Sequence, residues 1–173
     1  GTTGSTYAPV LALATAGDRV FAGLDGDGVL AFLWIRSGPS SASAVLPQEL
    51  GTSVVKGLTL DRTGDLIVAT FGQGAYELAF AKDGSVRSVT RYHEGNGLGS
   101  NTVSTAFVDR ENGLWLSRFS MGVARRLDRA VTWYAADQGV PAEVRSIGLV
   151  QNDVWLGTAA GTILVVSGST GAI

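Results

Sequence analysis

The sequence predicts an all-β protein, a β-propeller built from four four-stranded blades. Short runs of β-branched and aromatic residues are bounded by Gly, Asn, Asp or Pro, which is the pattern of strands joined by tight turns. The 173 residues contain 24 glycines but four prolines, and Gly supplies the positive φ that such turns need. The strand runs also repeat at intervals of 40 to 48 residues along the chain. Four-stranded units at this period are typical of propellers, where each unit buries its faces against its neighbours.

The clearest unit runs from Val103 to Glu143. Its turns fall at Asp109–Gly113 and Asp137–Pro141. Its four expected strands are Val103–Val108, Leu114–Ser117, Gly122–Leu127 and Ala130–Tyr134. These runs predict one antiparallel meander of about 40 residues.

The other units repeat this order of strands. The first strands are expected at Val10–Leu13, Val55–Leu60, Val103–Val108 and Val144–Val150. The second strands are expected to begin at Val20, Ile67, Trp115 and Trp155, which lie 47, 48 and 40 residues apart. A Gly then opens each third strand, at Gly28, Gly74, Gly122 and Gly161. The resulting blades are residues 8–50, 51–99, 100–141 and 142–173 of a single domain.

The fourth strands are less regular. They are expected at Ala42–Leu46, Val86–Tyr92 and Ala130–Tyr134, but the fourth unit has no such run after Ser167. Residues 1–7 end in Ser-Thr-Tyr, like the fourth strands that end in Thr-Arg-Tyr and Thr-Trp-Tyr, so we expect them to supply the missing outer strand. Pairing within one chain would close a four-bladed ring. Pairing with a second chain would give an eight-bladed homodimer, which is the favoured alternative.

Composition excludes several classes of function. The net charge is −2, and the basic residues are interspersed with acidic ones, so no nucleic-acid partner is expected. No run approaches the roughly 18 apolar residues of a membrane span, so direct membrane insertion is not expected. The absence of cysteine rules out disulfides, thiolate nucleophiles and Cys-based metal sites. The chain begins at Gly1, which suggests a processed protein or an excised piece.

The third unit resembles the repeat of the two-component regulator propeller family. The matching residues are Asp109, Gly113–Leu116, Gly122–Val123, Val131–Tyr134 and Gly139–Pro141. The second unit matches at Asp61, Gly64, Val89–Tyr92 and Gly97–Asn101, and the fourth at Trp155–Thr158. The resemblance implies an extracytoplasmic sensor domain of a signalling protein, periplasmic or at the cell surface, usually with many more repeats than four.

Other candidate sites have competing interpretations. His93 beside Glu94 is either a surface pair or, as an alternative function, the acid and base of a propeller lyase or hydrolase. Asp25 and Asp27 could bind calcium, but a turn between strands is favoured, because a full cation loop needs more oxygen ligands. The tryptophans could stack on sugars. Their recurrence instead predicts that Trp115 and Trp155 are buried between blades. No metal and no cofactor is predicted.

The favoured function is non-enzymatic binding at the face where the second-to-third and fourth-to-first strand loops emerge. Loops on a rigid scaffold usually carry specificity, and these loops differ between the units. The expected partner is a small molecule, glycan or protein. The candidate ligand-binding residues are Asp25, Asp27, Phe71, Gln73, Asn101, Arg118, Phe119, Met121 and Glu143.

Overall fold

The computed structural model describes residues 8–35, 38–39, 43–46, 48–127, 130–141, 143–170 and 172–173. The surroundings of side chains are described for these residues except at 32–35, 38–39, 43–46, 48, 127 and 130–133. The side chains of Trp34 and Trp133, and the whole of segment 1–7, therefore lie outside the described part of the chain.

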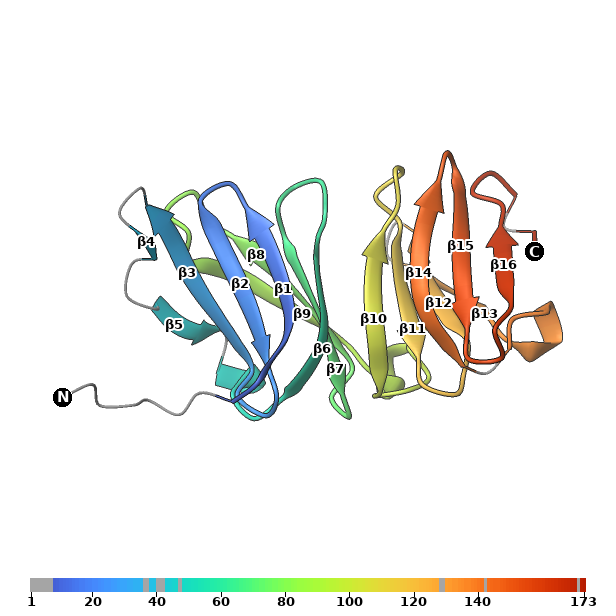
Figure 1. Ribbon diagram of the computed structural model, residues 1–173, viewed down its shortest axis with the longest axis horizontal. Helices are drawn as coiled ribbons and strands as arrows, with labels where there is room; N and C mark the ends of the chain where they lie inside the picture. The colour runs from blue at the N-terminus through green and yellow to red at the C-terminus, as the bar shows by residue number, and fades with distance from the viewer. Residues whose placement is uncertain are drawn as a thin grey trace.

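The fold is all-β, as predicted, and its strands form four antiparallel sheets in sequence order (Figure 1). Blade 1 contains β1 (Val10–Ala16), β2 (Arg19–Leu24), β3 (Val29–Ile35), β4 (Gly38–Pro39) and β5 (Ser43–Leu46). Blade 2 contains β6 (Val54–Leu60), β7 (Leu66–Phe71), β8 (Ala75–Phe80) and β9 (Val86–Tyr92). Blade 3 contains β10 (Val103–Val108), β11 (Leu114–Arg118), β12 (Val123–Leu127) and β13 (Ala130–Tyr134). Blade 4 contains β14 (Val144–Val150), β15 (Asp153–Thr158) and β16 (Ile163–Val166).

The blades stand side by side in an open arc. The first strands pack in succession, β1 on β6, β6 on β10 and β10 on β14. Blades 1 and 4 lie at opposite ends of the molecule in Figure 1, and the described residues show no comparable packing of β14 on β1. The chain is therefore a half-propeller of four blades. The four-bladed ring closed within one chain, one of the two alternatives open from the sequence, is not what this structure forms.

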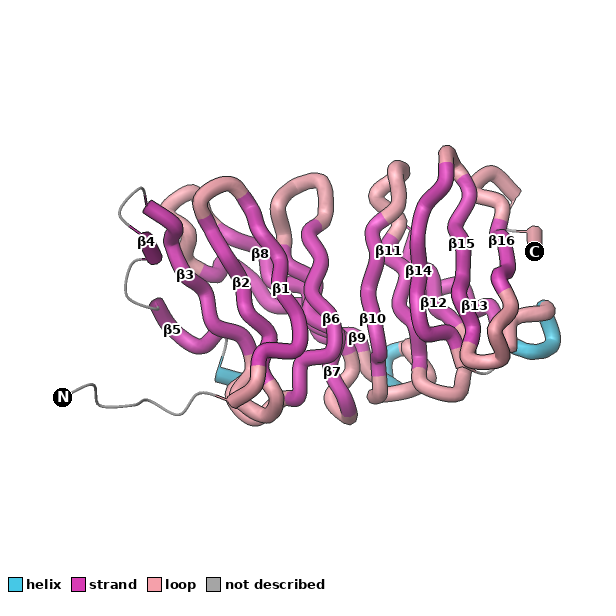
Figure 2. The backbone as a smooth tube through the Cα atoms, in the orientation of Figure 1, coloured by secondary structure: helices cyan, strands magenta, loops and turns pink. Residues whose placement is uncertain are grey.

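Short 3₁₀ helices lie along the lower edge of the arc in Figure 2. They are η1 (Gln48–Leu50), η2 (Glu94–Asn96) and η3 (Ala136–Gln138). Each lies between the last strand of one blade and the first strand of the next. This edge is therefore the face on which the fourth-to-first strand loops emerge, as predicted.

The turn between the second and third strands of each blade shows which residues of the four blades are equivalent. The same backbone hydrogen bond occurs from Leu24 to Gly28, Thr70 to Gly74, Arg118 to Gly122 and Thr158 to Thr162, at 2.8 to 3.0 Å. Two predicted alignments were wrong by one residue. Phe21, not Val20, is equivalent to Ile67 and Trp115, and Thr162 takes the place of the glycine that Gly161 was expected to provide.

The core lies between the blades. Within β11, Leu114 and Leu116 pack toward blade 2, whereas Trp115 packs toward blade 4. Because side chains alternate along a strand, each inner sheet buries one face on the preceding blade and the other on the following blade. Trp115 is fully buried, as predicted. Trp155 is not: it faces the side where a fifth blade would stand, and it is 38% exposed.

Candidate functional site

The two sets of loops that were expected to form a binding face meet along one edge. The backbone N–H of Gly28 donates to the carbonyl of Ser53 (3.1 Å), and that of Gly74 donates to the carbonyl of Asn101 (2.6 Å). Each bond joins a second-to-third strand loop to the segment that leads into the next blade. The face is therefore held rigidly by the backbone, which suits a surface that recognises a ligand.

Apolar side chains project from these loops on the two central blades. Phe71 and Phe119 are exposed and occupy equivalent positions, one residue after Thr70 and Arg118, and Met121 is exposed in the same loop as Phe119. Large apolar groups that stay exposed in loops on one face are a common feature of interaction surfaces.

The polar candidates differ in how firmly they are held. Asp25 and Asp27 are exposed in the blade 1 loop. The amide oxygen of Gln73 accepts from the Tyr76 hydroxyl (3.2 Å), and the amide oxygen of Asn101 accepts from the Glu94 N–H (2.9 Å). Gln73 and Asn101 are thus fixed in place, whereas both aspartates are presented to solvent.

Glu143 and Arg118 have structural partners. Glu143 pairs with Arg145 at 3.0 Å. Arg118 is 2% exposed, and its guanidinium donates to the carbonyls of Leu98 (3.3 Å) and Met121. Arg118 is buried beneath the Phe119–Met121 loop and holds it by a hydrogen bond. A direct contact between Arg118 and a ligand would therefore require that loop to rearrange.

His93 and Glu94, the alternative catalytic pair, sit at the start of η2. His93 Nδ1 accepts a hydrogen bond from the Gly95 N–H (3.1 Å), and the His93 N–H donates to the Asn96 side chain (2.7 Å). The imidazole thus caps the helix, satisfying a backbone donor at its first turn. Glu94 is exposed.

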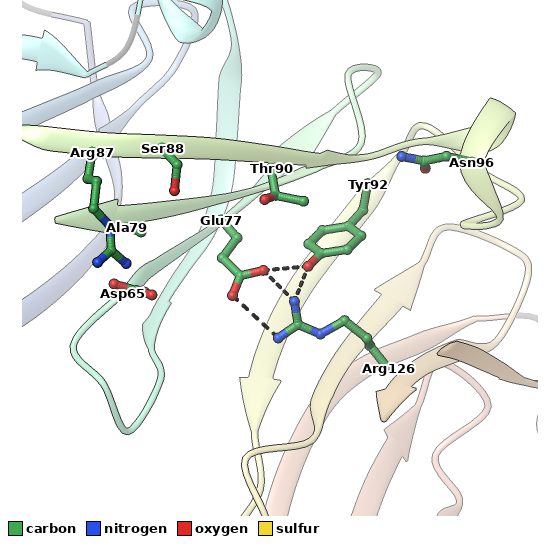
Figure 3. Close-up of a pocket in the computed structure, with 9 residues that line it drawn as sticks. All are labelled: Asp65, Glu77, Ala79, Arg87, Ser88, Thr90, Tyr92, Asn96 and Arg126. Carbon is green, nitrogen blue, oxygen red and sulfur yellow. Dashed lines mark hydrogen bonds and ion pairs between the residues drawn. The ribbon is translucent and has the colours of Figure 1, made fainter. Parts of the chain in front are cut away.

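A second region lies between the outer strands of blades 2 and 3 (Figure 3). It is a pocket of about 560 Å³, within the usual range of about 300 to 1,000 Å³ for small-ligand sites. Its lining residues are Asp65, Glu77, Ala79, Arg87, Ser88, Thr90, Tyr92, Asn96 and Arg126. The walls are mostly polar and carry both signs of charge.

Three of these side chains form one network that joins the two blades. Arg126 of β12 forms an ion pair and hydrogen bonds with Glu77 of β8, and it also donates to the Tyr92 hydroxyl, which in turn bonds to Glu77 (Figure 3). Burial, together with the hydrogen bond to Glu77, raises the pKa of the Tyr92 phenol above its ordinary value. The network thus keeps Tyr92 protonated and fixes the pocket wall.

Next to this pocket lies the only group of three or more potential metal ligands in the described residues. Carboxylate oxygens of Asp61, Asp65 and Glu77 lie within 4.8 Å of one another. Asp61 Oδ1 already accepts from the N–H groups of Thr63 and Asp65, both at 2.8 Å, and Glu77 is engaged by Arg126. Their oxygens could coordinate a hard cation, but their existing partners would compete with it.

Sequence reasoning missed the pocket, although the repeats carry a signal for it. In blade 3, Trp115 and Arg125 both donate to Asp109 Oδ2, at 2.8 Å. The equivalent residues in blade 2 are Ile67 and Glu77, so blade 2 has no such donors beside Asp61. A comparison of units position by position would have marked this departure.

Comparisons with known proteins agree with the arrangement of blades. No protein-family model and no curated protein matches the sequence. Among solved structures, the extracellular domain of the putative hybrid two-component system BT3049 from B. thetaiotaomicron superposes with a TM-score of 0.75 and 18% identity, over 94% of this chain. The extracellular domain of the putative hybrid two-component system BT4673 from the same organism gives 0.75 and 17% identity, over 99%.

The chain has the fold of a part of these extracellular domains. The predicted resemblance to two-component regulator propellers is thereby confirmed at the level of the fold. The chain spans 22% of the length of each of the two extracellular domains. The computationally designed Ika4 protein also matches, with a TM-score of 0.67 and 13% identity, over 93% of this chain and 92% of that one. A four-blade arrangement of this size therefore also occurs as nearly a whole chain.

Proposed function

We propose that this chain belongs to a non-enzymatic, extracytoplasmic sensor propeller that binds its ligand at the loop face. The main observation behind the proposal is that the Phe71, Phe119 and Met121 side chains are exposed on loops that backbone hydrogen bonds hold in place. Proteins with the same arrangement of blades include extracellular domains of two-component systems, which supports a sensor role and an extracytoplasmic location. No helix among the described residues is long and apolar enough to cross a membrane.

The chemistry of the loop face favours a glycan as the ligand. Aromatic rings supply large apolar contacts at a low cost in conformational entropy, because each has only two side-chain torsions. The exposed carboxylates of Asp25 and Asp27 can accept hydrogen bonds from hydroxyl groups. A sugar offers both an apolar face and hydroxyl donors. A catalytic role for His93 and Glu94 is less favoured, because the imidazole is committed to capping η2.

A glycan array, followed by titration calorimetry of each hit, tests the proposal. Phe119→Ala and Phe71→Ala should weaken binding by tenfold or more each, since central aromatic contacts usually contribute above about 1.4 kcal/mol. Thr90→Ala is the matched control, because it changes the inter-blade pocket and leaves the loop face intact. Binding abolished by Thr90→Ala and unaffected by both Phe variants would move the site to the pocket. Glycan cleavage abolished by His93→Ala would favour the enzyme.

A further inference from the structure

The outward face of blade 4 exposes apolar side chains that are buried at equivalent positions in the other blades. Trp155 is 38% exposed, whereas Phe21, Ile67 and Trp115 are at most 1% exposed. Ile163 is 66% exposed, and its equivalents Val29, Ala75 and Val123 are fully buried. In blades 1 to 3 the following blade covers these residues. Blade 4 therefore presents the surface of an inter-blade interface with no blade on it.

The outward face of blade 1 also exposes apolar side chains that are buried at equivalent positions in the other blades. Val10 is 54% exposed, and its equivalents Val55, Val103 and Val144 are at most 2% exposed. Leu13 is 65% exposed, whereas the equivalent residues Leu58, Ala106 and Ile147 pack against the preceding blade. The two ends of the arc are thus the two halves of one kind of interface.

The existing interfaces show how these halves would meet. Where blade 3 meets blade 4, the Ser117 hydroxyl donates to the carbonyl of Val144 (2.6 Å). Where blade 1 meets blade 2, a Cβ placed on Gly23 would lie 2.9 Å from the Cβ of Val55. The equivalent pair at the open ends is Gly157 of blade 4 and Val10 of blade 1. These two residues lie at opposite ends of the arc, so one chain cannot bring its own pair together without refolding.

We propose that a second copy of this chain closes the ring. Blade 4 of each copy packs on blade 1 of the other, which gives eight blades around a two-fold axis. A second copy is the occupant because it presents both required faces, the outward faces of blade 1 and blade 4, and because a two-fold dimer buries both ends of both chains at once. Exposed apolar groups at both ends supply the driving force.

Disulfide cross-linking tests the contact directly, because the native chain has no cysteine. The variant Val10→Cys with Gly157→Cys should form a covalent dimer under mild oxidation, since the equivalent residues are in direct contact at 2.9 Å and a small outward shift of one blade opens this to the roughly 3.5 to 4.5 Å between Cβ atoms that a disulfide spans. Residues with side chains occupy the position of Gly157 in blades 2 and 3, namely Ala69 and Ser117. Each single-cysteine variant is the control and should stay uncross-linked. A disulfide within one chain, or free thiols throughout, would overturn the proposal.

Sedimentation equilibrium of end-face variants provides an independent test. Trp155→Glu and Ile163→Glu should each raise the dimer dissociation constant at least thirtyfold, because the change is repeated at both interfaces. Phe119→Glu is the matched control: Phe119 is 51% exposed but lies on the loop face, and its variant should dimerise normally. Circular dichroism checks that each variant remains folded. Equal dissociation constants for all three variants and the native chain would contradict the proposal.

Discussion

Among single residues, Asp109 explains why the third unit combines an Asp, a Gly and a Trp. Asp109 Oδ1 accepts from the N–H groups of Glu111 (3.1 Å) and Gly113 (2.5 Å) and closes the turn. Its Oδ2 accepts from Trp115 Nε1 and pairs with Arg125, which lies 4.8 Å above the Trp115 ring. One buried carboxylate thus joins the turn, the second strand and the third strand.

Removing that carboxylate should be costly. In Asp109→Ala, the buried Arg125 guanidinium loses its counter-ion, and we expect a loss of about 3 to 5 kcal/mol in the free energy of unfolding. Urea denaturation measures the change. Glu143→Ala, which removes the exposed pair with Arg145, is the control and should cost at most about 1 kcal/mol. Similar losses in both variants would show that Asp109 has no special role.

Tyr92 should make stability depend on pH in the alkaline range. Its pKa is raised in the folded protein by burial and by the hydrogen bond to Glu77, so the folded state holds the phenolic proton more tightly than the unfolded state. This contribution is fully present below about pH 10, the unfolded pKa, and is lost as pH rises toward the folded pKa. Unfolding free energies measured from pH 8 to 11 should therefore fall less steeply in Tyr92→Phe. The same slope in both proteins would contradict this.

At the scale of elements, the turn from the second to the third strand depends on glycine for two separable reasons. Gly74 and Gly161 have similar left-handed backbones, with φ of +87° and +77°. A Cβ on Gly74 would also collide with the carbonyl of Tyr92, whereas a Cβ on Gly161 would meet nothing within 4 Å.

Gly161 stands one position before Thr162, the residue equivalent to Gly74, but the similar φ values of the two glycines allow their substitutions to separate the two effects. Gly161→Ala should cost about 1 kcal/mol or slightly more from backbone strain alone, and Gly74→Ala should cost clearly more, because the collision adds to the same strain. Thermal unfolding of both variants measures the difference. Equal melting temperatures would mean that blade 2 relaxes around the added methyl group.

The strands predicted best were those with a strong periodic pattern. Val103–Val108 and Val86–Tyr92 have the predicted bounds, because alternation and flanking Gly, Asp and Asn residues mark both ends. The second strand of blade 1 was misaligned by one residue, because Val20, Phe21 and Ala22 are all apolar and no tryptophan marks the face.

At the scale of the whole molecule, the sequence predicts the number of blades but not what covers each face. The exposure of Trp155 was missed because its local pattern matches that of Trp115, and burial depends on whether another blade stands beside it. The loop face could be located from the topology. The repeats mark Glu77 as a departure from blade 3, but the pocket itself was missed, because it forms where Glu77 of one blade meets Arg126 of the next, 49 positions later in the chain.

Small-angle X-ray scattering over a concentration series tests the central claim, that this chain is half of a ring, most directly. A dimeric ring should give a forward scattering that corresponds to twice the chain mass of 17.9 kDa, with the pair-distance distribution of a closed disc. Dilution should return the scattering to that of a single elongated arc. A particle of 17.9 kDa at every concentration, with the dimensions of either an open arc or a closed four-bladed ring, would contradict it.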